Sequence, residues 1–294
     1  MSAVRRARVL LIGASGQLGS DLARVFEGPD LVALPRQELD VTDPAAVAGV
    51  VAAVEPAWVL NATAFSRVDD AERDPTAAFA LNAVAVHHLA RAAERYRARL
   101  VHFSTDYVFG GTGAGPFTEA AAPAPPNAYG VSKLAGERLV QNAGPRHLVI
   151  RSAGLYGVAG SSGKGGNFVE TMLRLSRDGK PIRVVDDQVL TPTYTADLAQ
   201  AVRRLLAVDP PGGIYHLTNR GACSWFEFAR RVFALCGLAP DLAPTTSAAF
   251  GAPAPRPANS VLLDTRTAAL GFGPLRPWPD ALRAYLQAKG HLAT

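Results

Sequence analysis

The 294 residues of the chain are 48% hydrophobic and 19% charged, which supplies a sizeable core and excludes a disordered protein. The formal net charge of +5 permits an anionic partner, but the basic residues form no dense run, so we expect no nucleic-acid binding. No apolar run approaches the roughly 18 residues of a membrane span, and the two cysteines lack the spacing of a zinc site. We therefore expect a cytoplasmic protein with no membrane segment and no bound metal.

Short apolar runs alternate with helical patterns through the first half of the chain. Their near-continuous hydrophobicity suits strands that are covered on both faces. Asp43-Pro44 and Asp74-Pro75 each place a capping acid before a proline, which indicates the start of a helix. This alternation predicts an α/β fold with a doubly wound parallel sheet of the Rossmann type. The expected strands are residues 8–13, 31–35, 57–63, 98–105 and 147–154.

After about residue 155 the pattern loosens, and a smaller second domain is expected to be partly interleaved with the first. Residues 157–168 are rich in glycine but lack the Walker spacing, so we expect a mobile loop near a site. Helices are expected over 169–179 and near 196–208, a strand near 214–218, and a helix start at Ser224-x-x-Glu227. The predicted dinucleotide-binding domain is 1–156 with about 192–220, and the substrate domain is 157–191 with about 221–294.

The stretch GASGQLG, residues 13–19, follows the first strand directly and has the spacing G-x-x-G-x-x-G. Glycines let the backbone approach a pyrophosphate, and the next helix offers unpaired N–H groups at its N-terminus. A tight turn with incidental glycines is the alternative, which the flanking strand and helix make weaker. The second strand ends at Pro35-Arg36 without an acid, which favours NADP(H) and leaves NAD(H) open.

Tyr129 and Lys133 stand four residues apart in NAYGVSKLAGE and share one face of a helix, about 5–6 Å apart. A nearby ammonium lowers the pKa of a phenol from ~10, which suits general acid–base work. Ordinary helix packing is the better explanation of the pair when it is taken alone, because this spacing often occurs by chance. The fourth strand, however, ends in Ser104-Thr105 at the edge where parallel sheets bind ligands. Strand alternation allows one of these hydroxyls to orient a substrate carbonyl and leaves open which.

Taken together, these motifs resemble the extended short-chain dehydrogenase/reductases, and more narrowly the dTDP-4-dehydrorhamnose reductase family. The resemblance covers nearly the whole chain. The last two of its blocks lie outside the cofactor fingerprint and are the more specific ones. The blocks are GASGQLG, LDVTDP, NATAFSRVDDAE, STDYVF, YGVSK, GGNFVETMLRL, DQVLTPTYTADLA and RPANSVLLD.

The resemblance implies reduction of the 4-keto group of dTDP-4-dehydro-L-rhamnose by NAD(P)H, in a monomer or homodimer. It implies a catalytic triad of Thr105, Tyr129 and Lys133. The cofactor residues, from the motifs or the resemblance, are Gly13, Ser15, Gly16, Gln17, Leu18, Gly19, Arg36, Asp40, Val41, Ala62, Thr63 and Ala64, with Tyr129 and Lys133. The implied substrate residues are Thr105, Asp106, Gly154, Asn167, Gln188 and Arg256.

One position departs from the family pattern. Gly154 stands where the family often has a tryptophan that would pack on the sugar, so the identity of the sugar stays open. Two alternatives follow: another nucleotide-sugar reductase or epimerase of the same family, or a non-catalytic NADP-binding regulatory subunit. An epimerase would retain its cofactor and show no net oxidation of NADPH.

Overall fold

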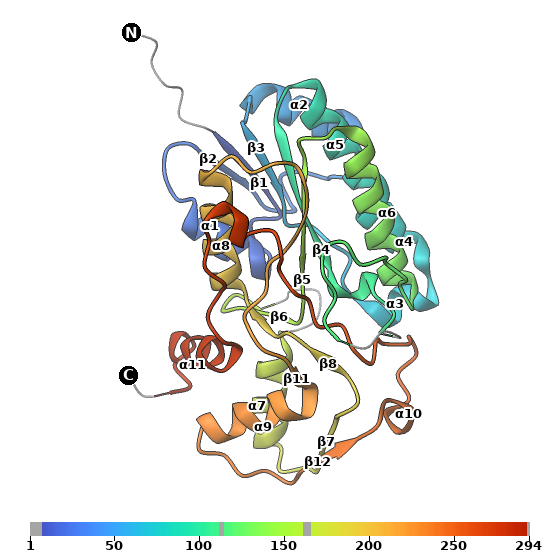
Figure 1. Cartoon of the computed structure of the whole chain (residues 1–294), viewed down its shortest axis with the longest axis vertical. Helices are drawn as coiled ribbons and strands as arrows, with labels where there is room; N and C mark the ends of the chain where they lie inside the picture. Colours follow the sequence, from blue (N-terminus) through green and yellow to red (C-terminus); the bar gives the residue numbers. More distant parts are fainter. Residues whose placement is uncertain (1–7, 112–114, 161–165, 293–294) are drawn as a thin grey trace.

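A parallel sheet of six strands forms the upper half of the computed structural model (Figure 1). The structure describes residues 8–111, 115–160 and 166–292. The strand order is β2-β1-β3-β4-β5-β10, and every neighbouring pair is parallel. This confirms the predicted α/β fold with a doubly wound sheet. The strands are β1 (Val9–Ile12), β2 (Leu31–Leu34), β3 (Trp58–Asn61), β4 (Arg99–Thr105), β5 (Leu148–Ser152) and β10 (Gly213–His216).

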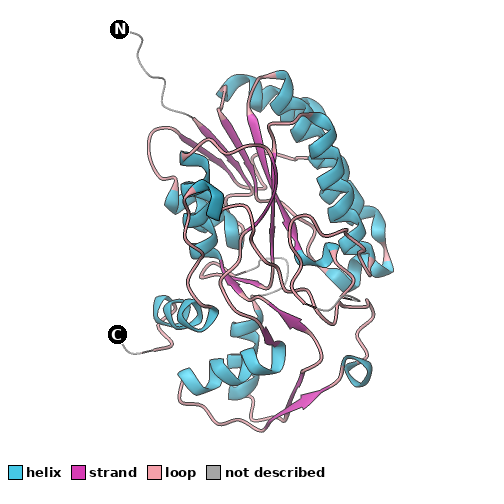
Figure 2. Ribbon diagram, in the orientation of Figure 1, coloured by secondary structure: helices cyan, strands magenta, loops and turns pink. Residues whose placement is uncertain are grey.

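Helices cover both faces of this sheet, and each face has its own apolar core (Figure 2). Val9 and Leu11 of β1 pack with the helices of one face, whereas Leu10 and Ile12 pack with those of the other. The near-continuous hydrophobicity of the strands is explained, because successive side chains enter opposite cores. One face carries α1 (Gln17–Val25) and α8 (Thr195–Ala207); the other carries α2 (Pro44–Val54), α5 (Ala85–Arg95) and α6 (Ala128–Ala143).

The helix starts expected at Asp43 and Asp74 are present, since each carboxylate accepts hydrogen bonds from N–H groups of the following turn. The second start opens a run of α3 (Val68–Arg73), α4 (Pro75–Phe79), a π-helical turn η1 (Ala80–Val84) and α5. The π turn lies against α6, where a Cβ at Gly136 would come 2.2 Å from the carbonyl oxygen of Asn82. Glycine at this position therefore lets α6 approach η1 closely.

The lower half of Figure 1 holds short strands and helices with separate apolar clusters, centred on Tyr156 and Phe228 and on Ile182 and Phe233. The predicted capping box at Ser224 is formed. The elements are β6 (Leu155–Tyr156), α7 (Phe168–Arg177), β7 (Ile182–Val185), β8 (Val189–Leu190), β9 (Thr193–Tyr194), β11 (Cys223–Ser224), α9 (Trp225–Leu235), β12 (Leu242–Thr245), α10 (Ser247–Phe250) and α11 (Trp278–Ala288). The short helix η4 (Ala268–Leu270) instead lies against the core of the large sheet.

The chain returns to the large sheet after the first part of this lower half. Helix α8 packs on α1, and β10 adds to the sheet beside β5. We propose on this basis the division expected from the sequence, with 1–156 and about 192–220 in one domain and the rest in the other. Of the loop predicted over 157–168, residues 161–165 lie outside the described residues.

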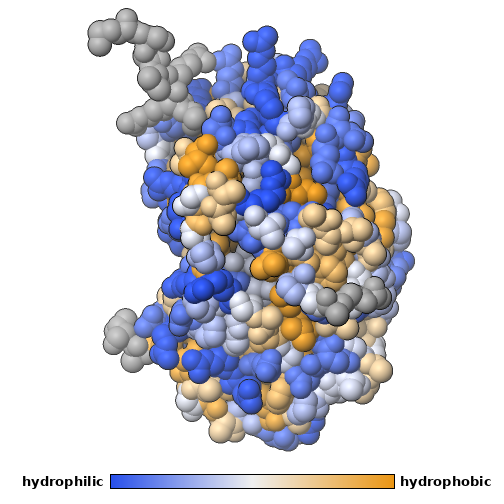
Figure 3. Space-filling model, viewed as in Figure 1, coloured by the Kyte–Doolittle hydropathy of each residue, from blue (hydrophilic) through white to orange (hydrophobic). Residues whose placement is uncertain are grey.

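On the face shown in Figure 3, apolar residues occur in several separate groups among hydrophilic ones. Across the described ranges, every helix is too short or too polar to cross a bilayer. In the same ranges, the structure gathers no three His, Cys, Asp or Glu side chains into a group that could hold a metal ion.

Candidate active site

The glycine turn lies at the point where the strand order reverses, between β1 and β3, where ligands bind in open α/β sheets. Gly13 has a φ of +83°, and a Cβ there would lie 3.0 Å from Cγ2 of Thr63, which follows β3. A Cβ at Gly19 would lie 2.0 Å from the carbonyl oxygen of Gly13. Both positions therefore need glycine, the first for its left-handed backbone and the second for the close approach of α1.

The N-terminus of α1 presents backbone N–H groups that no side chain caps, with Gly16 at the N-cap position. The side chain of Gln17 does not cap this helix, because its Nε2 donates to the carbonyl oxygen of Leu155 at 3.1 Å. Ser15 is exposed on the turn, whereas the side chain of Leu18 is buried in the core. An open helix N-terminus beside a glycine cradle fits the pyrophosphate of a dinucleotide.

The other expected cofactor residues lie along the same carboxyl edge. Arg36 is exposed just after β2, and its charge adds to the hydrogen bonds from Thr42 that lower the pKa of Asp40. The side chain of Val41 is part of the core and is not available to a ligand. Residues 62–64, that is Ala62, Thr63 and Ala64, follow β3 next to the glycine turn.

Thr105 and Ser104 at the end of β4 have different partners. The Thr105 hydroxyl hydrogen-bonds with Tyr129 and donates to Oδ1 of Asp106 at 3.0 Å. Ser104 instead donates to Oε1 of Glu137, which is buried on α6, at 2.5 Å. Strand alternation left open whether Ser104 or Thr105 orients the substrate. These partners favour Thr105, because its hydroxyl is the one that meets Tyr129.

The electrostatics of Tyr129 and Lys133 differ from the sequence expectation. Burial raises the pKa of Tyr129 to about 12, although its hydrogen bond with Thr105 acts in the opposite direction. Lys133 is 1% exposed, and its Nζ donates to the carbonyl oxygen of Phe103 at 2.6 Å. Burial lowers the pKa of Lys133 to about 8, against the charge of Glu137. The expected lowering of the Tyr129 pKa is therefore wrong for this arrangement, because desolvation dominates and the amine is directed at β4.

A carboxylate that links two distant segments stands beside the triad. Asp106 is 3% exposed and accepts from Thr105 and, at 2.6 Å, from the hydroxyl of Ser260. Ser260 was not singled out from the sequence, although it lies within the block RPANSVLLD. Burial raises the pKa of Asp106 to about 6, against these hydrogen bonds. Asp106 therefore fixes the rotamer of Thr105 and ties it to the C-terminal segment.

The buried Asp106 predicts a pH dependence of stability. Its pKa rises from 3.8 to about 6 on folding, so the folded state binds the extra proton between these pH values. The stabilisation is present below about pH 4 and is lost as the pH rises through about 6, on the order of 3 kcal/mol. In urea unfolding, Asp106→Asn should remove this part of the pH slope between pH 4 and 7. Equal slopes for wild type and variant would contradict this assignment.

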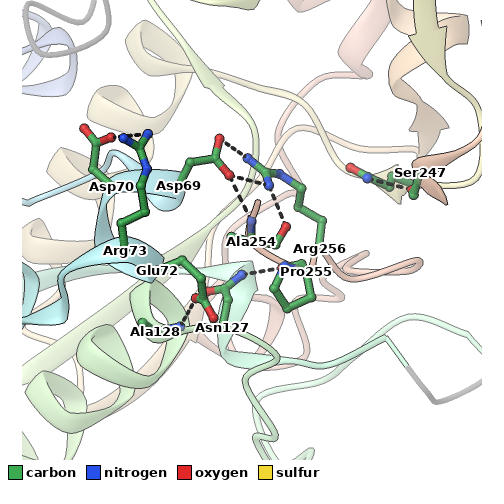
Figure 4. A network of polar contacts seen from close by, with 11 residues as sticks. Asp69, Asp70, Glu72, Arg73, Asn127, Ala128, Ser247, Ala254, Pro255 and Arg256 are labelled. Atoms are coloured by element: carbon green, nitrogen blue, oxygen red, sulfur yellow. Dashed lines mark hydrogen bonds and ion pairs between the residues drawn. The ribbon is translucent and has the colours of Figure 1, made fainter. Parts of the chain in front are cut away.

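Arg256 connects the C-terminal segment to α3 and α6 in the network of Figure 4. Its guanidinium donates to both carboxylate oxygens of Asp69, at 2.8 and 2.9 Å. Nearby, Nδ2 of Asn127 donates to the carbonyl oxygen of Pro255 at 2.8 Å (Figure 4). Arg256 also hydrogen-bonds the hydroxyl of Tyr107, whose ring lies edge-on to Tyr129 at 5.8 Å between centroids. Arg256 is thus close to the triad and already has an anionic partner.

Three other expected substrate residues have structural partners in this fold. Asn167 caps α7, and its Nδ2 donates to the carbonyl oxygen of Gly157 and to the hydroxyl of Tyr285. Gln188 donates to the hydroxyl of Ser247 at 2.8 Å. Gly154 has a φ of +52°, and a Cβ there would lie 2.6 Å from Leu190. Each polar atom of Asn167 has a partner, and the positive φ of Gly154 disfavours any larger residue there, tryptophan included.

The parallel sheet, the glycine cradle and the hydroxyl–phenol–amine group define a dinucleotide-binding protein of the oxidoreductase type. A family model described as RmlD substrate binding domain matches residues 7–290, and the chain belongs to this family, as the sequence predicts. The chain is 44% identical to a dTDP-4-dehydrorhamnose reductase of Streptomyces griseus, over 96% of this chain and 94% of the relative. It is 45% identical to a probable dTDP-4,6-dihydroxy-2-methyloxan-3-one 4-ketoreductase of Streptomyces antibioticus, over 94% of this chain and 93% of the relative.

A solved structure of a dTDP-4-dehydrorhamnose reductase from Bacillus anthracis, in complex with NADP, has the same fold. The TM-score is 0.90 and the sequence identity is 35%. The alignment covers 96% of this chain and 99% of that structure. The likeness therefore extends over both halves of the molecule.

Proposed function

We propose that this protein is an NADPH-dependent oxidoreductase that reduces the 4-keto group of dTDP-4-dehydro-L-rhamnose to give dTDP-L-rhamnose. The observation that carries the proposal is the placing of Thr105, Tyr129 and Lys133 together at the carboxyl end of β4. The names of the relatives and the NADP in the related structure support it. Both the reductase activity and the use of NADP(H) agree with the sequence expectation.

The bound cofactor supplies the hydride, and the chain supplies position and a proton. The glycine turn and the N-terminus of α1 hold the phosphates, while Arg36 lies where it can meet a 2′-phosphate. Thr105 orients the sugar carbonyl, and Tyr129 gives its phenolic proton to the carbonyl oxygen as negative charge develops there. The raised pKa of Tyr129 keeps this proton in place at neutral pH until it is needed.

A second candidate function is the reduction of another 4-keto sugar attached to dTDP. The observation in its favour is Gly154, whose positive φ disfavours the tryptophan that the family pattern often places there. The Streptomyces antibioticus relative is itself named for a different 4-keto sugar. Asn167, Gln188 and Arg256 remain proposed substrate residues, although each has a protein partner in this structure.

The test is the consumption of NADPH by purified protein with dTDP-4-dehydro-L-rhamnose and, in parallel, with other dTDP-4-keto sugars. The proposal predicts the highest kcat/KM with dTDP-4-dehydro-L-rhamnose. A higher value with another 4-keto sugar would establish the second candidate. Epimerised product without net NADPH consumption would identify an epimerase, and tight NADPH binding without any turnover would identify a regulatory subunit.

Replacing Gly19 by alanine is expected to weaken NADPH binding at least tenfold, equal to about 1.4 kcal/mol or more. The new Cβ would lie 2.0 Å from the Gly13 carbonyl oxygen, which forces the turn apart. The matched control is Gly49→Ala in α2, where a Cβ has no neighbour within 4 Å. This control should raise stability by about 0.5–1 kcal/mol and leave the Kd unchanged. Isothermal titration calorimetry checks both; equal Kd values for wild type and Gly19→Ala would contradict the cradle.

The location and assembly expected from the sequence, a cytoplasmic monomer or homodimer, belong to the same proposal. Light scattering of the purified protein measures the mass in solution. A mass above that of a dimer would contradict this part.

A further inference from the structure

A line of buried polar side chains runs through the sheet behind the candidate active site. Asn61 of β3 and His102 of β4 are direct partners in the parallel register, and both are fully buried. Nδ2 of Asn61 lies 3.2 Å from Nδ1 of His102, and Nε2 of His102 lies 3.3 Å from Nζ of Lys133. The line thus connects the end of β3, where Thr63 faces the glycine turn, with the amine of the triad.

The direction of the hydrogen bonds along this line is fixed at one end. The backbone N–H and the hydroxyl of Thr63 both meet the same side-chain atom of Asn61, at 3.1 and 2.6 Å. A backbone N–H can only donate, so this atom is the oxygen of the amide and the NH₂ group faces His102. Nδ1 of His102 must then accept, which places the imidazole proton on Nε2, opposite Lys133.

A proton on His102 Nε2 leaves one arrangement in which all groups are satisfied. An ammonium at Lys133 would set two donors against each other at 3.3 Å, whereas a neutral amine accepts from Nε2 and still donates to the Phe103 carbonyl oxygen. We propose that His102 is a positioning residue, which favours the neutral amine of Lys133 in the cofactor-free protein and couples its protonation to the Asn61–Thr63 contact.

The electrostatic surroundings agree with this arrangement. The groups around Lys133 are Tyr129 and Glu137 on its own helix and His102 on β4, and the charge of Glu137 is taken up by Arg151 of β5. Burial, followed by the charge of Lys133, lowers the pKa of His102 well below its usual value, so the imidazole stays neutral. Burial likewise lowers the pKa of Lys133 to about 8, so the neutral amine predominates above that pH.

Charging Lys133 therefore has a consequence at the cofactor edge. For an ammonium to donate to Nε2, the imidazole proton must move to Nδ1, and the Asn61 amide must then turn its oxygen toward His102. That rotation would remove the acceptor of the Thr63 N–H. The inference rests on the proposed function only for its meaning in catalysis, because the network itself is a property of the protein without cofactor or sugar.

The first experiment reads the histidine tautomers by ¹⁵N NMR of the cofactor-free wild-type protein at a pH above 8, where Lys133 is mostly neutral. Two other histidines serve as internal references. Nδ1 of His147 accepts from the Leu100 N–H, which fixes the Nε2–H form, and Nδ1 of His216 faces the Leu263 carbonyl oxygen, which fixes the Nδ1–H form. The His102 signals should match those of His147. A match to His216, or an imidazolium, would overturn the proposal.

The second experiment follows the titration of Lys133, one of four lysines in the chain, by NMR of side-chain-labelled protein, with exposed Lys180 as the reference. In His102→Gln the side-chain NH₂ can still donate to Lys133. The shorter side chain of His102→Asn can contact Asn61 but cannot reach Lys133. The pKa of Lys133 should rise by about one pH unit or more in His102→Asn and stay low in His102→Gln. The Thr63 amide should titrate with Lys133 in the wild type.

Each outcome decides between a positioning role and simple space filling. Equal titration of Lys133 in both variants, or a Thr63 amide that does not respond, would mean that His102 only fills space. Should either variant fail to fold, the wild-type tautomer still decides, with signals assigned through substitutions of His87, His88 and His291. None of these measurements needs turnover, so failure of the proposed reductase activity would be seen separately.

Discussion

Replacing Tyr129 by phenylalanine is expected to lower kcat for sugar reduction by about 10²–10⁴-fold while KM changes little. The phenol lies beside Thr105 and can give a proton to a carbonyl oxygen, and its raised pKa keeps that proton bound at neutral pH. The substitution leaves the ring and its edge-on contact with Tyr107 in place. Folding should therefore survive, with a loss of at most about 1.5 kcal/mol for one hydrogen bond.

Steady-state kinetics with NADPH and the keto sugar check this result. Tyr96→Phe is the matched control, since the half-buried Tyr96 follows α5 at its C-terminal end and its ring packs against Arg95. The control should keep wild-type kcat. Unchanged turnover in Tyr129→Phe would remove Tyr129 from the role of proton donor.

Replacing Glu137 by glutamine is expected to destabilise the protein by about 3–5 kcal/mol. Arg151 donates to both oxygens of Glu137, at 2.9 and 2.6 Å, and each side chain is 1% exposed. Ser104 adds a third donor at 2.5 Å. The neutral amide removes the charge that compensates the buried guanidinium and turns a donor toward it.

Urea unfolding at pH 7 measures this loss, and Arg151→Met in the Glu137→Gln background should recover part of it. The matched control is Asp70→Asn, which breaks the exposed ion pairs of Asp70 with Arg67 and Arg73. Each of these pairs should be worth less than about 1 kcal/mol. A loss for Glu137→Gln as small as that of the control would show that the buried pair does not support the fold.

Much of the sheet could be predicted from the sequence because its strands are buried on both faces. β1, β3, β4 and β5 lie inside the runs expected from continuous hydrophobicity, and α2 begins at the proline after its capping acid. The joining of β10 to β5 could not be predicted, since hydrophobicity shows that a strand is buried but not which strand it pairs with. The π-helical turn η1 was also missed, because its apolar pattern resembles that of an ordinary helix.

The triad could be expected from the Tyr129–Lys133 spacing, but its details depend on contacts between distant segments. The choice of Thr105 over Ser104 follows from the position of α6, whose Glu137 takes the serine. The link between Asp106 and Ser260 spans 154 residues and leaves no local pattern. His102 could have been singled out from the sequence, because it is a polar residue in a strand expected to be buried on both faces.

The clearest error in the prediction from sequence concerned the direction in which the side chain of Lys133 points. Helical spacing places the two side chains on one face, but it does not show where a long flexible amine finds its acceptor. Nζ of Lys133 donates to the carbonyl oxygen of Phe103 in β4 at 2.6 Å, and burial raises the pKa of Tyr129. A free backbone acceptor at the end of a parallel strand is invisible in a sequence pattern.

The central claim, hydride delivery to carbon 4 of a dTDP-linked keto sugar, is tested most directly by isotope transfer. NADPH carrying deuterium at both hydrogen positions of nicotinamide carbon 4 is incubated with dTDP-4-dehydro-L-rhamnose and the protein, and the product is examined by NMR. Our account predicts deuterium at carbon 4 of the product sugar with wild type, and a strongly reduced rate of its appearance with Tyr129→Phe. A wild-type reaction that leaves the deuterium on the nicotinamide, or an unchanged keto sugar, would contradict it.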